Sequence, residues 1–140
     1  MKAEIFLPED YRPAESEPFM NDLQLEYFRR KLIVWKQELL GQSAETIDNL
    51  QDSARSVPDL ADRASEETDR ALELRTRDRQ RKLVGKIDAA LRLIENGEYG
   101  YCEVSGEPIS LKRLDARPIA TMTLESQEKH ERREKVHRDE

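Results

Sequence analysis

Cysteine, glycine, proline and aromatic residues are all scarce in this chain, and each shortage excludes a class of protein. One cysteine among 140 residues excludes an intrachain disulfide framework and cannot by itself form a structural zinc site. Five glycines and six prolines argue against a turn-rich all-β fold. Aromatic residues make up 6% of the chain and all hydrophobic residues 36%, so a thick core is not expected.

Long apolar runs and an excess of positive charge are also missing. No segment approaches the roughly 18 apolar residues of a membrane span, and the N-terminus lacks the apolar stretch of a secretory signal. The net charge of −6 argues against a mainly electrostatic grip on DNA or RNA. We therefore expect a cytoplasmic protein that does not contact membranes.

Charged residues, by contrast, are abundant, at 39% of the chain where about 25% is usual in globular domains. This composition favours long solvated helices with a narrow buried seam. A helix is expected over residues 21–50, which would span about 45 Å. Its apolar residues recur in steps of three and four, as in a heptad, at Leu25, Phe28, Leu32, Trp35 and Leu39.

A second helical pattern runs from about residue 60 to Asn96, after a break at residues 51–59 that contains Pro58. Its apolar residues, at the same spacing, are Leu83, Ile87, Ala90 and Ile94. Two helices with one apolar stripe each should pair antiparallel as a coiled-coil hairpin. A hairpin that only packs, with no further role, is the plain alternative.

The predicted fold class is mainly α, a long antiparallel coiled-coil hairpin with a small globular head. Residues 1–20 form a leader that is part of the head, and residues 21–96 form the hairpin, with its tip near 51–64. Residues 97–124 form a turn-rich knot and residues 125–140 a polar terminal helix. We expect a monomer.

Two aspartates mark the predicted tip. Asp59 and Asp62 are three residues apart, so their carboxylates can share one face of the helix and reach a recessed partner or metal ion. The alternative is structural, because Asp59 can cap the helix and Asp62 can favour its positive end.

The charge then reverses along the second helix. Residues 59–69 hold five acids and one base, whereas residues 70–92 hold eight bases and three acids. Within the basic part, one stripe follows steps of four, three and four, through Arg75, Arg79, Lys82 and Lys86. A solvated face would explain it, and so would an anion-binding edge for a protein or a phosphorylated ligand. A nucleic-acid-binding surface over residues 75–92 is a third reading, which the net charge of −6 opposes.

The knot carries two incomplete metal-binding frames. Cys102 and Ser105 have the spacing of a Cys-x-x-Cys pair, and Thr123 and Ser126 repeat that spacing without sulfur. One thiolate and three hydroxyls would be a poor zinc site, so we expect Cys102 to be a small buried residue. No glycine-rich phosphate loop and no pairing of a nucleophile with a base is present, so no catalysis is expected.

Over nearly its whole length the chain resembles the DksA/TraR family of bacterial RNA polymerase-binding regulators. The resemblance is carried by residues 59–64, 72–83, 99–103 and 113–118, which read DLADRA, LELRTRDRQRKL, YGYCE and RLDARP. It implies a hairpin that enters the secondary channel of RNA polymerase and does not read DNA sequence. It also implies modulation of promoter-complex stability, at ribosomal RNA and amino-acid promoters, with ppGpp in the stringent response.

The resemblance also implies roles for individual residues. Asp59, Asp62 and Ala64 fall on the functional tip of the family. Arg79 and Lys82 fall on positions for polymerase docking. The expected ppGpp-binding residues are Lys82, Leu83, Lys86 and Arg117.

Two departures from the family pattern matter. The four zinc cysteines of the common form correspond to Cys102, Ser105, Thr123 and Ser126, so no zinc cofactor is expected. The head would then be held by apolar packing, with candidate core residues Val104, Ile109, Leu111, Leu114, Ile119, Met122 and Leu124. A basic residue of the family's ppGpp site corresponds to Gln127, which should weaken ppGpp binding.

A second function uses the same channel. A Gre-like transcript-cleavage factor also has an acidic coiled-coil tip, which helps the polymerase to bind catalytic Mg²⁺. Ala64 beside the aspartates fits the DksA/TraR pattern better.

Overall fold

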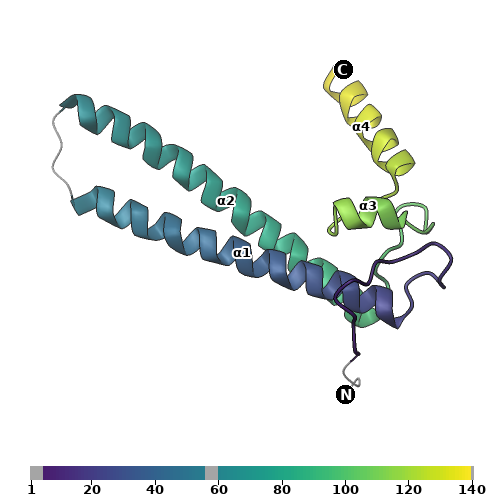
Figure 1. Ribbon diagram of the computed structural model, residues 1–140. Helices are drawn as coiled ribbons and strands as arrows, with labels where there is room; N and C mark the ends of the chain where they lie inside the picture. The colour runs from purple at the N-terminus through teal and green to yellow at the C-terminus, as the bar shows by residue number, and fades with distance from the viewer. Residues whose placement is uncertain (1–4, 56–59, 140) are drawn as a thin grey trace. The chain divides into compact units, whose positions relative to one another are not determined.

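A computed structural model describes residues 5–55 and 60–139, and the regular structure in these ranges is helical apart from one isolated bridge between Tyr101 and Pro108 (Figure 1). The helices are α1 (Asp22–Arg55), α2 (Leu60–Asn96), α3 (Leu111–Ala116) and α4 (Leu124–Asp139). α1 and α2 lie side by side and antiparallel, which confirms the predicted long helix pair. Within the described ranges, no helix is both long enough and apolar enough to cross a bilayer.

The chain divides into two compact units. The hairpin unit comprises Ile33–Asp88, and the head unit comprises the described residues up to Leu32 together with those from Ala89 onward. Each unit therefore contains a part of both long helices, and only the head unit contains α3 and α4.

α1 is longer than its apolar pattern indicates. It begins at Asp22 because Asn21 caps it, with the Asn21 Oδ1 accepting the Gln24 N–H at 2.8 Å. It ends at Arg55, so residues 51–55 are helical where a break was predicted. These five residues include no glycine or proline, and Pro58 is the first position after them that lacks a backbone donor.

In the hairpin unit, the buried residues on the facing helices are Leu39 on α1 and Ile87 and Gln80 on α2. Gln80 makes two hydrogen bonds across the pair: its Nε2 donates to the Gln42 Oε1 at 2.9 Å, and its Oε1 accepts from the Ser43 Oγ at 3.1 Å. We call Gln42, Ser43 and Gln80 the polar layer. Beyond it, within residues 44–49 and 63–79, no side chain is fully buried.

The head unit has an apolar core made from both long helices and the knot. Its buried members are Phe28, Leu32, Ala90, Ile94, Tyr99, Cys102, Ile109, Leu111, Leu114 and Ile119. The prediction that Val104 and Leu124 belong to this core was wrong, because they are 70% and 58% exposed. Val104 lies in the turn closed by the Gly106 N–H on the Cys102 carbonyl, and Leu124 lies on the wall of an open groove.

The knot folds back on itself between Gly100 and Ile109. The Cys102 N–H donates to the Glu107 carbonyl and the Ile109 N–H to the Gly100 carbonyl, both at 2.8 Å. Gly100 has φ +94°, and a Cβ there would lie 3.0 Å from the Met20 Cε, so a glycine is required. α3, which was not predicted, follows at once.

Asp115 of α3 joins that helix to α1. Its Oδ1 accepts hydrogen bonds from the Lys31 Nζ at 2.7 Å and the Tyr27 hydroxyl at 2.6 Å. These two bonds, the Lys31 bond first, hold the pKa of Asp115 below its usual value. Lys31 also donates to the Asp115 backbone carbonyl at 2.6 Å. Three contacts thus fix the orientation of α3 within the head unit.

Candidate functional site

The predicted tip falls at the start of α2. Asp59 lies outside the described residues. Asp62 is in the first turn of α2, and its side chain is also outside the described part of the chain. Ala64 is exposed. The predicted roles of these residues therefore depend on their position in the sequence and on the helix that begins at Leu60.

The predicted basic stripe is a continuous exposed surface of α2. Arg75, Arg79, Lys82 and Lys86, which we call the Arg79 row, are all exposed, while Leu83 beside them is half-buried. Within residues 5–55 and 60–139, no carboxylate forms an ion pair with any of these four cations. Four adjacent unpaired cations produce a positive potential that favours an anionic partner.

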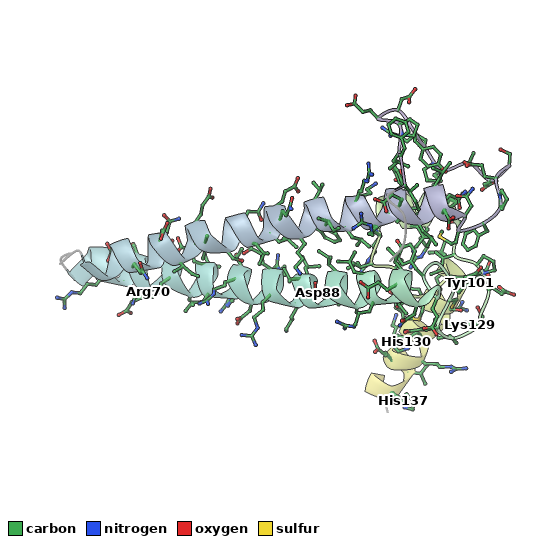
Figure 2. All side chains as sticks on the ribbon, turned by 90° about the horizontal axis from the view of Figure 1, so that it is seen from below. Arg70, Asp88, Tyr101, Lys129, His130 and His137 are labelled. Carbon is green, nitrogen blue, oxygen red and sulfur yellow. The ribbon has the colours of Figure 1, made fainter. Side chains whose placement is uncertain are left out.

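A few cations in the described part of the chain are paired. Glu26 accepts from Arg29 and Arg30 at 2.7 Å, and Lys36 donates to Asp88 at 2.7 Å across the hairpin unit. Figure 2 labels Asp88 on α2, together with Arg70 closer to the segment that joins the two long helices. The cations of the Arg79 row, like several others on the described surface, are therefore available to a partner.

Arg117, the predicted ligand residue of the head unit, lies at the end of α3. Its backbone N–H donates to the Arg113 carbonyl at 2.8 Å, and its exposed side chain has no ion-pair partner among residues 5–55 and 60–139. The side chain lines an open groove of about 540 Å³ between α3 and the start of α4. Lys112 lines the same groove. It was not predicted as a site residue, because α3 itself was not predicted.

Gln127 lies on the first part of α4 and is half-buried. Its Nε2 donates to the Glu131 Oε1 at 3.1 Å, so its amide is already engaged along the helix. Lys82, Leu83 and Lys86 belong to the hairpin unit, whereas Arg117 and Gln127 belong to the head unit. The predicted ppGpp-binding residues are thus divided between the two units.

The four positions that correspond to zinc cysteines form a hydrogen-bonded cluster. The Cys102 Sγ lies 3.4 Å from the Ser126 Oγ and accepts the Ser105 N–H at 3.5 Å. The Thr123 Oγ1 donates to the Ser126 Oγ at 3.1 Å and lies 3.9 Å from the Cys102 sulfur. The Ser105 hydroxyl instead accepts the Glu107 N–H at 3.4 Å. Three of the four side chains therefore meet around the sulfur.

The Cys102 side chain is buried, as predicted, at 3% exposure. Burial raises the pKa of its thiol, but hydrogen bonds from Ser105, Ser126 and the Thr123 backbone outweigh burial and lower the pKa to about 6. The Ser105 N–H and the Thr123 hydroxyl face the sulfur as donors, and the Ser126 hydroxyl lies beside it.

Two family profiles match consecutive parts of the chain. Residues 24–94 match "DnaK suppressor protein DksA, N-terminal domain". Residues 97–132 match "Prokaryotic dksA/traR C4-type zinc finger". The first match covers most of both long helices, and the second covers the knot, α3 and the first half of α4.

Several curated relatives are similar over most of their length. The chain is 68% identical over 130 residues to "RNA polymerase-binding transcription factor DksA" from Caulobacter vibrioides, covering 93% of this chain and 92% of the relative. It is 42% identical over 127 residues to the Escherichia coli K12 protein of the same name, covering 91% and 84%. The solved structure of transcription factor DksA2 from Pseudomonas aeruginosa matches with a TM-score of 0.79 and 38% identity, over 86% of this chain and 95% of that one.

The zinc ion that the second profile implies does not fit the residues of this chain. Of the four corresponding positions only Cys102 carries sulfur, and neutral hydroxyls are not ligands of structural zinc. Over residues 5–55 and 60–139, no group of three or more histidine, cysteine, aspartate or glutamate side chains could hold a metal. The hydrogen-bonded cluster stands where the metal would be.

Proposed function

This chain belongs to the DksA/TraR family, and we propose that it is a non-enzymatic transcription regulator that binds RNA polymerase through the secondary channel. In this proposal the hairpin enters the channel and brings Asp59, Asp62 and Ala64 close to the active centre. Binding there changes the stability of promoter complexes, at ribosomal RNA and amino-acid promoters, without sequence-specific contact to DNA.

The observation that carries this proposal is the charge distribution along the hairpin. Acidic residues precede a stretch of α2 in which Arg79 and Lys82 are exposed and unpaired among the described residues. A paired antiparallel helix hairpin is thin enough to probe a channel, and free cations along its side can meet carboxylates of the partner. The Caulobacter relative, at 68% identity, is named for RNA polymerase binding.

The ligand part of the proposal assigns ppGpp to Lys82, Leu83, Lys86 and Arg117 at the interface with polymerase. Lysine and arginine donate charge-assisted hydrogen bonds to phosphate, and arginine does so with two parallel bonds. Gln127 offers a neutral amide where the common family form has a cation. We therefore propose that this chain responds to ppGpp at higher concentrations than the common form does.

The head works without zinc in this proposal. The donors around the Cys102 sulfur and the buried apolar residues of the knot supply the cohesion that a metal supplies in four-cysteine relatives. The role of the knot is to hold Arg117 and the start of α4 in place.

The tip assignment is tested with Asp62→Asn, which keeps the size of the side chain and removes its charge. We expect RNA polymerase binding to survive and the effect on promoter-complex lifetime to be largely lost. Asp69→Asn is the matched control, because it makes the same change on an exposed residue of the same helix, seven positions further along. If Asp62→Asn shortens the lifetime of promoter complexes as the parent protein does, the tip assignment is wrong.

An RNA-cleavage assay with the parent chain separates this function from the transcript-cleavage alternative. Added to backtracked transcription complexes, the parent chain should leave the length of the RNA unchanged. Shortening of the RNA on addition of the protein would favour the Gre-like function.

A further inference from the structure

A second basic row runs along α2 on a different side from the Arg79 row. It consists of Arg70, Leu74, Arg77 and Arg81, spaced by four, three and four, and we call it the Arg77 row. At 100° per residue these four side chains lie within about 60° of one another around the helix axis. All four are exposed, and Leu74 is 43% exposed. Figure 2 labels Arg70, the first member of the row.

The two rows flank the face of α2 that is buried against α1. Gln80 occupies that face, because it is buried and hydrogen-bonded to Gln42 and Ser43. Arg79 precedes Gln80 by one residue and Arg81 follows it by one, so the two arginines are rotated about 100° from Gln80 in opposite directions. The hairpin therefore presents arginines on both sides of its buried seam at the same level.

The chain itself does not use the Arg77 row. In the described part of the chain, no carboxylate forms an ion pair with its three guanidinium groups. Asp78 stands three residues before Arg81, as Glu26 stands before Arg29, yet only the Glu26 pair forms. An intramolecular role in helix stabilisation therefore does not explain the row.

The composition of the row fits a protein surface better than a nucleic acid. Arginine pairs with carboxylates through two parallel hydrogen bonds and is weakly hydrated, and an exposed leucine at the centre adds apolar contact. Gly85, four residues after Arg81, is exposed, and its missing side chain leaves room for close approach. The net charge of −6 opposes binding to a polyphosphate backbone.

We propose that the Arg77 row is a second docking surface, which binds a carboxylate-bearing protein wall opposite the one that meets the Arg79 row. The inference rests on the proposed function, because a partner that encloses the hairpin would contact both rows at once. The rows overlap along the helix over residues 75–81, so their contacts would form in a single insertion event. Polymerase is accordingly the occupant, through an acidic surface on each side of the hairpin.

The test compares three double variants of the full chain in equilibrium binding to core RNA polymerase. Arg77→Ala with Arg81→Ala removes the charge of the new row. Arg75→Ala with Arg79→Ala does the same for the first row. Arg132→Ala with Arg133→Ala on α4 is the control, because it changes the net charge equally at exposed positions of the head unit.

We expect the Arg77/Arg81 variant to bind about tenfold more weakly, with each missing arginine contributing roughly a threefold factor. Its affinity should also fall less steeply with salt than that of the parent. Arg77→Lys with Arg81→Lys should recover part of the affinity, because charge remains and the paired hydrogen bonds do not. The control variant should bind like the parent.

The outcomes separate this inference from the proposed function. If the Arg75/Arg79 variant loses affinity and the Arg77/Arg81 variant does not, the second docking surface is refuted and the proposed function stands. If the parent chain does not bind polymerase, both fall. Loss of binding to single-stranded RNA by the Arg77/Arg81 variant, with polymerase affinity kept, would also overturn the proposal.

Discussion

Tyr99 holds the knot together through one buried hydrogen bond. Its hydroxyl donates to the Pro118 carbonyl at 2.7 Å, and its ring lies 5.6 Å from that of Phe28. Burial raises the pKa of Tyr99, so the hydroxyl stays protonated and remains a donor across the accessible pH range. Because Pro118 follows Arg117 directly, this bond ties the start of the knot to the proposed ligand residue.

Tyr99→Phe removes one oxygen atom and keeps the ring, so it breaks the bond without opening a large cavity. The Pro118 carbonyl would be left without a donor in a buried position. A stranded buried acceptor together with the broken bond costs about 1–3 kcal/mol in the free energy of unfolding. For a unit of this size, a decrease of about 2 kcal/mol lowers the melting temperature by roughly 8–16 °C.

The control is Tyr101→Phe, two residues away. Tyr101 is 42% exposed and its ring packs edge-on against Phe19 at 5.4 Å, with no hydrogen bond from its hydroxyl to any residue in 5–55 or 60–139. We expect this variant to melt within about 4 °C of the parent, since surface changes of this kind usually cost less than about 0.5 kcal/mol. Thermal and urea unfolding of the three proteins measure the difference. Equal melting temperatures for the two variants would refute the reasoning.

Three further predictions concern the metal, acid stability and ppGpp. The purified protein should contain no stoichiometric zinc, and chelators should leave its melting temperature unchanged; one zinc per chain by elemental analysis would contradict this. Because the pKa of Asp115 is lowered in the folded state, its contribution to stability is present above the usual carboxyl value of 3.8 and is lost as pH falls below it. Asp115→Asn should therefore destabilise the protein at pH 7 and flatten the loss of stability on acidification, which unfolding at several pH values would measure. Gln127→Lys should lower the ppGpp concentration needed for half-maximal inhibition at a ribosomal promoter, and an unmoved titration curve would refute the placement of the ligand.

The long helices could be predicted because their signals are local. Phe28, Leu32 and Leu39 follow one another at helical spacing, and each proved to be buried. The Arg79 row was found by the same periodicity, since residues three and four apart on a helix are neighbours whatever the rest of the fold does. The prediction placed the end of α1 too early, at residue 50. Residues 51–55 contain no glycine or proline, so nothing in their sequence stops the helix.

The head could not be predicted in the same way, because its contacts join residues far apart in the chain. Asp115 binds Tyr27 and Lys31, which are 88 and 84 residues earlier, and no spacing rule connects them. α3 has only six residues, too few to be stable alone, and depends on the Ser110 cap and the burial of Leu114. The groove beside Arg117 is formed partly by α3, so the residues that line it could not be predicted either.

The polar layer explains why binding and stability can be separated on this hairpin. Gln80 is buried, whereas every described side chain of residues 63–79, which precede it on α2, is exposed or half-buried. Truncating the exposed Arg77 in that stretch, or the exposed Arg81 just after Gln80, leaves the buried seam intact and breaks no ion pair found in the described chain, so the effect of each on unfolding should be within about 0.5 kcal/mol. Weaker binding of polymerase by an Arg77/Arg81 variant would therefore reflect the absence of its hydrogen bonds to the partner. Gln80 differs from both neighbouring arginines, because its substitution would alter the pairing of α1 and α2 itself.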